Sequence, residues 1–256
     1  MKISSIIKIL ILVFYTSSVS VVSAETSIKS SAKVTMFGAD TAFTLPRGDI
    51  FVGATIADPR GGIRGSDTDG DLAFGAGFGD PFKSVGFEID TNITSLTNDF
   101  ADSGSLTLKA SRALLSQPNY VVFGAVSAAN LGSWGDARVT DKAYNLIFSG
   151  VTQIDGYSLI HPLMWTVGYG TDSVLSTAGS SRTEQGIFAG LGLGITQNIG
   201  ASISATENQL NAGVGFKIPG LDDISVSYGI NDITDNMERK QQTLSVSYSL
   251  TDIFGG

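Results

Sequence analysis

Cysteine is absent from this 256-residue sequence, and histidine occurs once, at His161. Without cysteine the chain can form no disulfide framework, no thiolate metal centre, no cysteine nucleophile and no lipid-modified amino-terminal cysteine. Charged residues are also scarce, at 16%, whereas mean hydropathy is positive at +0.19. Disordered chains have the opposite composition, so the sequence predicts a folded protein.

No hydrophobic run at the amino terminus is long enough to span a membrane as a helix. The uncharged stretch 9–24 turns polar after Tyr15, short of the roughly 20 apolar residues that such a helix needs. A short basic stretch precedes it, and small residues suited to a signal peptidase end it at Ala24. We interpret residues 1–24 as a secretory signal peptide that is cleaved before Glu25.

Acidic residues outnumber basic ones. The full chain has 16 Lys and Arg against 24 Asp and Glu, a net charge of −8, and loss of Lys2 and Lys8 with the signal peptide makes this −10. Such a surface does not suit nucleic acid or anionic lipid headgroups.

From Gly48 onward apolar residues recur at every second position, which is the period of a β-strand. In one segment Phe87 and Ile89 alternate with Glu88 and Asp90. Across most segments the second face consists of Ser, Thr and Gly rather than the long charged residues that keep a soluble sandwich in water. Such a face suits the inside of a closed barrel whose apolar face meets lipid.

The pattern predicts an all-β protein with about twelve strands, an even number as in bacterial outer-membrane barrels. Short turns on one rim alternate with longer, polar links on the other; one short turn, Asp155-Gly156, is expected to be of type I′. We assign 25–47 to a periplasmic amino-terminal segment and 48–256 to the barrel. The expected strands are 49–57, 70–79, 84–94, 105–115, 120–128, 142–154, 157–170, 186–197, 199–206, 210–217, 223–230 and 243–250.

The last strand resembles the carboxy-terminal assembly signal of Gram-negative outer-membrane β-barrel proteins. That signal has a polar residue, a small residue and two hydrophobic or aromatic residues in alternation, and Thr243, Ser245, Tyr248 and Leu250 take these positions. The class usually has glycine where Ser245 stands and an aromatic residue at the end, whereas this chain ends with two glycines. The resemblance implies an outer-membrane barrel of the porin-like class, without selecting a family within it.

Residues that could support catalysis are few. A barrel enzyme of the outer-membrane phospholipase type has a serine two residues after its histidine, but Leu163 takes that place here. A nucleophile needs a base within hydrogen-bond reach, and the chain offers no second histidine. We therefore expect an interfacial His161, no enzymatic activity and no cofactor.

One acidic cluster and two glycine series need separate interpretation. Asp67, Asp69 and Asp71 alternate as in a calcium loop, but the downstream glutamate of an EF-hand is missing, so we favour a solvated loop tip over a calcium site of roughly millimolar affinity. The series that begin at Gly75 and Gly190 lack phosphate-loop spacing. We expect both on the inner face of the barrel, where the glycines let the sheet bend and let aromatic rings such as Phe51 and Phe188 lie over them.

These features together predict a passive, porin-like channel for small solutes or ions, in contact with outer-membrane lipid. The expected pore-lining charges are Glu88, Asp90, Lys109 and Lys217, and Lys109 could pair with a neighbouring carboxylate. Together with the acidic outer loops they favour a weak preference for cations. Two alternatives stay open, a non-conducting surface or adhesion barrel and a soluble secreted all-β binding domain. The sequence leaves the solute and the oligomeric state undetermined.

Overall fold

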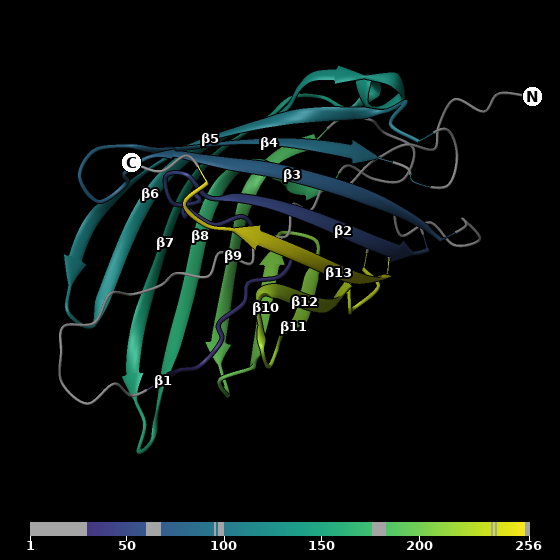
Figure 1. Cartoon of the computed structure of the whole chain (residues 1–256). Coiled ribbons are helices and arrows are strands. Elements are labelled where there is room, and N and C mark those ends of the chain that lie inside the picture. The colour runs from purple at the N-terminus through teal and green to yellow at the C-terminus, as the bar shows by residue number, and fades with distance from the viewer. Residues whose placement is uncertain are drawn as a thin grey trace, which may run out of the picture.

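A computed structural model describes residues 30–59, 68–94, 96, 100–175, 183–236, 238 and 240–253. Twelve antiparallel strands pair in sequence order, and β8 also pairs with β9, so the sheet closes into a barrel (Figure 1). The predicted fold class is confirmed. The strands are β2 (Ile50–Asp58), β3 (Asp69–Gly79), β4 (Gly86–Thr94), β5 (Gly104–Gln117), β6 (Tyr120–Trp134), β7 (Ala143–Asp155), β8 (Leu159–Leu175), β9 (Thr183–Gly194), β10 (Ile199–Thr206), β11 (Leu210–Ile218), β12 (Leu221–Asn231) and β13 (Gln241–Leu250).

The apolar phase of the strands faces outward. Leu191 on β9 is 52% exposed and pairs with Ile203 on β10, which is 45% exposed, whereas the polar Ser204 beside it is 2% exposed. This cross-strand pairing turns the alternation of the sequence into a continuous apolar outer belt, with polar and small side chains on the inner face of β9 and β10. Among the described residues no helix is long and apolar enough to cross a membrane.

Several strand boundaries differ from the prediction, most clearly those of β6, β8 and β9. Strand β6 continues to Trp134, where a 3₁₀ turn at Gly135–Val139 follows, because its ladder with β5 extends to the Gly104–Trp134 pair. The expected type I′ turn at Asp155-Gly156 is wrong. Asp155 remains in the ladder opposite Ile160, so the connection to β8 consists of three residues, 156–158. Neither Asp155 nor Gly156 has the positive φ that a type I′ turn requires.

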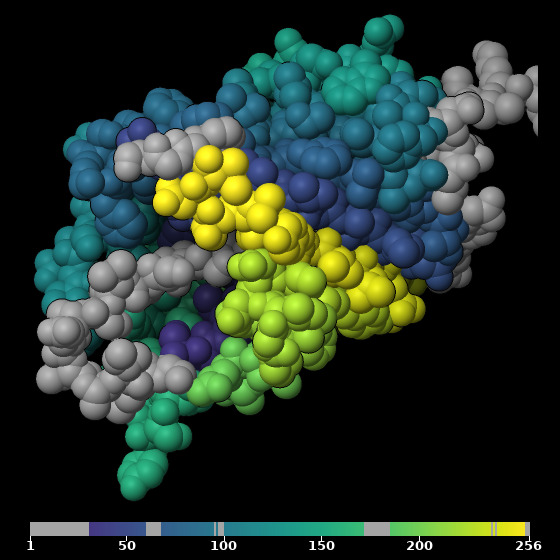
Figure 2. Space-filling model, in the orientation of Figure 1, coloured from purple at the N-terminus to yellow at the C-terminus, as the bar shows by residue number. Residues whose placement is uncertain are grey.

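The chain before β2 lies inside the barrel. Its first two described residues form β1 (Ser30–Ser31), which pairs in parallel with the start of β8. From there the chain passes through the interior and returns to the same rim, where the Gly48 amide donates to the carbonyl oxygen of Gly77 at 3.1 Å (Figure 1). Figure 2 shows purple atoms of this part within the opening of the barrel. We call residues 31–47 the luminal segment.

The luminal segment corrects the assignment of 25–47 to the periplasm over the part that the structure describes. Its Met36, Ala42 and Phe43 are at most 4% exposed and form a small hydrophobic core with inward side chains of β6 to β9. An extended periplasmic leader would leave these apolar groups in water, and their burial stabilises the internal position. The wall residues of this core are Val121, Phe123, Ala125, Ile147, Val151, Met164 and Phe188.

Candidate functional site

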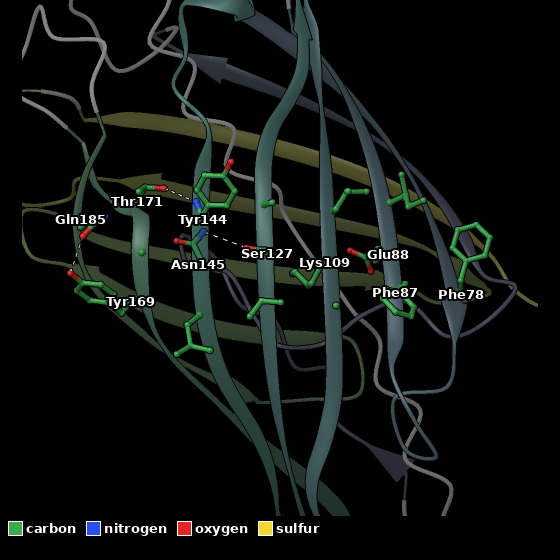
Figure 3. A pocket seen from close by; sticks show the side chains of 17 residues that line it. Phe78, Phe87, Glu88, Lys109, Ser127, Tyr144, Asn145, Tyr169, Thr171 and Gln185 are labelled. Carbon is green, nitrogen blue, oxygen red and sulfur yellow. Dashed lines mark hydrogen bonds between the residues drawn. The ribbon is translucent and has the colours of Figure 1, made fainter.

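A row of polar side chains crosses the inner wall from β4 to β7. The register places Glu88 beside Lys109, Lys109 beside Ser127, and Ser127 beside Asn145. All four residues are at most 6% exposed, and Figure 3 draws them on four neighbouring strands. The Asn145 Nδ2 donates to Ser127 Oγ at 3.4 Å. Asp90, which is fully buried, lies two residues further along β4, so two carboxylates and one ammonium share this part of the wall.

Asp40 of the luminal segment lies against this row. Its Oδ1 is 2.6 Å from Lys109 Nζ, which also donates to the Thr41 carbonyl oxygen at 2.9 Å. Ser127 Oγ donates to Asp40 Oδ2 at 3.3 Å, and Thr166 Oγ1 donates to the Asp40 carbonyl oxygen at 2.9 Å. The Lys109 side chain is 0% exposed and that of Asp40 is 22% exposed, so the carboxylate covers the ammonium on the luminal side.

Wall side chains also satisfy backbone groups of the luminal segment. Glu88 Oε2 accepts from the Leu45 amide at 2.6 Å, and Ser149 Oγ accepts from the Ala42 amide at 2.8 Å. Ser111 Oγ donates to the Ala42 carbonyl oxygen. An extended segment that runs alongside a wall without joining its sheet needs such partners, because unpaired buried backbone groups are costly.

The opposite wall, from β9 to β12, accommodates the segment with glycine. A Cβ added to Gly229 would lie 1.9 Å from the ring of Phe37, and one added to Gly190 would lie 2.6 Å from Met36 Sδ. At Gly192 the atom in the way is a backbone oxygen, that of Thr35, at 2.0 Å. Glycine leaves space here for another chain to approach closely.

The predicted contact of the Phe51 ring with the first glycine series is confirmed, since an added Cβ at Gly75 would be 2.1 Å from the ring. The Phe188 ring lies at the same distance from Gly168 and not over the series that begins at Gly190, where Met36 of the luminal segment takes that place. Sequence reasoning did not find that glycines also face the luminal segment.

The other predicted site residues lie apart from this row. Lys217 is half-buried near the short-turn rim, where its Nζ is 2.9 Å from Asp222 Oδ1. Asp67 lies outside the described residues, and Asp69 Oδ1 accepts the amides of Gly70 and Leu96 at 2.7 and 3.1 Å. In the described part of the chain no three His, Asp or Glu residues are grouped so as to hold a metal ion, and the calcium site stays a prediction.

The single histidine lies near the short turn between β7 and β8. Its Nδ1 is 2.9 Å from the carbonyl oxygen of Gly194, a backbone group that cannot act as a nucleophile. The expectation of an interfacial residue without a catalytic partner therefore stays a prediction.

The outer face of the same wall carries an apolar depression of about 940 Å³. Figure 3 shows Phe78, Phe87, Tyr144 and Tyr169 around it. Tyr169 Oη donates to Gln185 Oε1 at 3.3 Å, so this ring joins an apolar body to a polar tip, as interfacial rings do. The polar row and the apolar depression are thus opposite faces of the same strands.

Comparison with known proteins identifies relatives in structure alone. No protein-family model and no curated protein matches the sequence. Among solved structures, the KdgM porin aligns with a TM-score of 0.49 at 10% identity, over 79% of this chain and 99% of that chain. The COG4313 outer membrane channel from Pseudomonas putida F1 aligns with a TM-score of 0.47 at 10% identity, over 82% and 98%. The NanC porin aligns with a TM-score of 0.52 at 7% identity over 79% and 99%, and this chain therefore shares the closed antiparallel barrel fold of an outer-membrane porin.

Proposed function

We propose that this protein is a Gram-negative outer-membrane barrel that acts as a passive channel for small solutes, with a weak preference for cations. The observation that carries the proposal is a polar interior inside an apolar outer belt. An eight-stranded barrel is just wide enough for its own side chains to fill, whereas twelve strands enclose a wider interior. Here the inner wall between β4 and β7 carries Glu88, Asp90 and Lys109.

Further inner polar groups support a hydrated lumen. Within the described part of the chain, five inward side chains on β4, β5, β10 and β13 have a buried polar atom with no protein hydrogen-bond partner. Buried polar groups without protein partners require water, and water between the segment and the wall offers a path for ions. These side chains are Asn92, Ser105, Thr107, Ser202 and Thr243.

The preference for cations follows from the charges of the lumen. Along the row from β4 to β7, Asp40, Glu88 and Asp90 contribute three carboxylates against the ammonium of Lys109. Lys33 and Lys217 lie at the short-turn rim, where Lys217 pairs with Asp222. Inside a narrow, low-dielectric passage, charges act on passing ions more strongly than in bulk water. A net negative lumen therefore favours cations.

Reversal potentials in a planar bilayer under a KCl gradient test this proposal. We expect cation selectivity for the wild type and a smaller preference for the double variant Glu88→Gln with Asp90→Asn. The control is Glu207→Gln, which removes one carboxylate from an exposed link outside the lumen. Anion selectivity of the wild type, or unchanged selectivity in the double variant, refutes the proposal that these carboxylates set a preference for cations.

The location of the protein belongs to the same proposal. The exposed apolar belt supports a lipid-embedded barrel over a soluble secreted domain, because soluble proteins rarely expose apolar patches of this extent. The signal peptide and its cleavage before Glu25 lie outside the described residues and stay a prediction. A barrel that folds in lipid but gives no conductance would favour the alternative of a surface or adhesion protein.

A further inference from the structure

We propose that the luminal segment, residues 31–47, is part of the ion pathway and that its Asp40 determines selectivity together with the wall. This inference rests on the channel function proposed above and assigns a residue outside the strands to the filter. The sequence predicts that the pore charges lie on the barrel wall and in the outer loops, and this inference adds one from the luminal segment.

The first argument is the order of charges seen from the lumen. The Lys109 ammonium is fully buried behind Asp40, while a fifth of the Asp40 side chain is exposed. An ion in the remaining water therefore meets the carboxylate before the ammonium. Without Asp40 the same ion would meet a lysine on the wall first, and the attraction of a cation to the cluster would be weaker.

The second argument is that Asp40 is held in one place. Its carboxylate binds two wall side chains, and its carbonyl oxygen accepts from Thr166. On one side of it Gly38 turns the chain with φ +76°, and on the other the Phe43 ring packs edge-on against Phe123 at 5.2 Å between centroids. A charge that is fixed in this way acts on a passing ion without first being ordered.

The third argument is the net charge of the cluster, which gives an ordered series of variants. With Asp40, Glu88 and Asp90 ionised and Lys109 protonated, the cluster carries −2. Asp40→Asn changes this to −1, Lys109→Gln changes it to −3, and the double variant restores −2. All substitutions keep the approximate size of the side chain, so the series varies charge more than the width of the passage.

The test measures the ratio of potassium to chloride permeability in planar bilayers, for variants that retain the heat-modifiable gel mobility of a folded barrel. We expect the ratio to be highest for Lys109→Gln, lowest for Asp40→Asn, and close to the wild-type value for the double variant. Each single step should change the ratio by about twofold or more, since one elementary charge a few ångströms away acts at least this strongly even at nearly bulk-water dielectric. If Asp40 had only a structural role, the double variant would not regain the wild-type permeability ratio.

A deletion of residues 31–45 separates failure of this inference from failure of the channel function. If the wild type conducts and the charge series leaves the ratio unchanged, the inference is overturned and the channel stands. If the wild type is silent and the folded deletion variant conducts, the open channel is overturned, while control of the pathway by the segment is supported. If neither conducts although both fold, both proposals are overturned.

Discussion

The fit between the luminal segment and the glycine wall predicts a large penalty for one added methyl group. In Gly192→Ala the new Cβ would lie 2.0 Å from the Thr35 carbonyl oxygen, whereas ordinary contact begins at 3.4 Å, so the oxygen would have to retreat by about 1.4 Å. The segment cannot retreat freely here. The nearby Lys33 amide donates to the Thr196 carbonyl oxygen at 2.9 Å, and the Thr35 side chain packs against Gly215 on β11.

The matched control is Gly53→Ala on β2, where the nearest atom to an added Cβ lies at 3.8 Å. Alanine at such a site stabilises by about 0.4–1 kcal/mol, because it restricts the unfolded chain. Overpacking by one methyl group costs about 1–3 kcal/mol. We therefore expect Gly192→Ala to lower the free energy of unfolding by about 1–2 kcal/mol, while Gly53→Ala leaves it unchanged or raises it.

Urea unfolding in phospholipid vesicles, followed by gel mobility and by tryptophan fluorescence, measures both values. The same two substitutions in the chain that lacks residues 31–45 complete a double-mutant cycle. There the obstacle is gone, and Gly192→Ala should behave like Gly53→Ala. The internal position of the segment is refuted if Gly192→Ala is harmless in the full chain, or if its penalty persists after the deletion.

Two further predictions use the same unfolding assay. Leu191→Arg on the outward phase of β9 should cost about 2–4 kcal/mol, whereas Ile195→Arg in the turn after the same strand should cost about 0–1 kcal/mol, and equal penalties would mean that the outer face does not meet lipid. At the short-turn rim, burial and then the charge of Lys217 lower the pKa of Lys33 from 10.5 to about 8. The folded state disfavours the charged form of Lys33, so this destabilisation is fully present below pH 8 and disappears between pH 8 and 10.5. The free energy of unfolding of the wild type should therefore rise across that window relative to that of Lys33→Met. Parallel pH profiles of the two proteins would contradict this.

The strands could be predicted because the sequence repeats one physical rule along most of its length. A strand between lipid and a polar lumen needs alternating side chains, and a slip of one residue would turn the whole apolar set inward. This is why Ile89 and Glu88 point to opposite sides as expected. The ends of strands, such as that of β6 at Trp134, were predicted less well. The ladder near a strand end depends on pairing with a neighbouring strand rather than on alternation.

The luminal segment could not be predicted from its own residues. It has no sustained period of two or 3.6, and the apolar Phe37 and Phe43 are too far apart to indicate a strand or a helix. Its position depends on side chains more than 60 residues away, such as Lys109, and on the space left by glycines such as Gly229. Glu88, Asp90 and Lys109 are buried on the inner side, as the alternation predicts, but their partner in the segment was missed.

The path of the luminal segment explains how it can enter a barrel whose wall it contacts on both sides. Near its start the Ala32 amide donates to the Ile160 carbonyl oxygen, beside the short turn after β7, and directly after its end the Gly48 amide donates to the Gly77 carbonyl oxygen, beside the short turn after β3. Both ends therefore lie at one rim, and Gly38 turns the chain deep inside, where Asn211 Nδ2 donates to its carbonyl oxygen at 3.4 Å. The segment can insert as a loop, with no need to thread the amino terminus through the barrel. Its contacts with β9 to β12 join residues about 150 or more positions apart, which are the long-range contacts that slow folding.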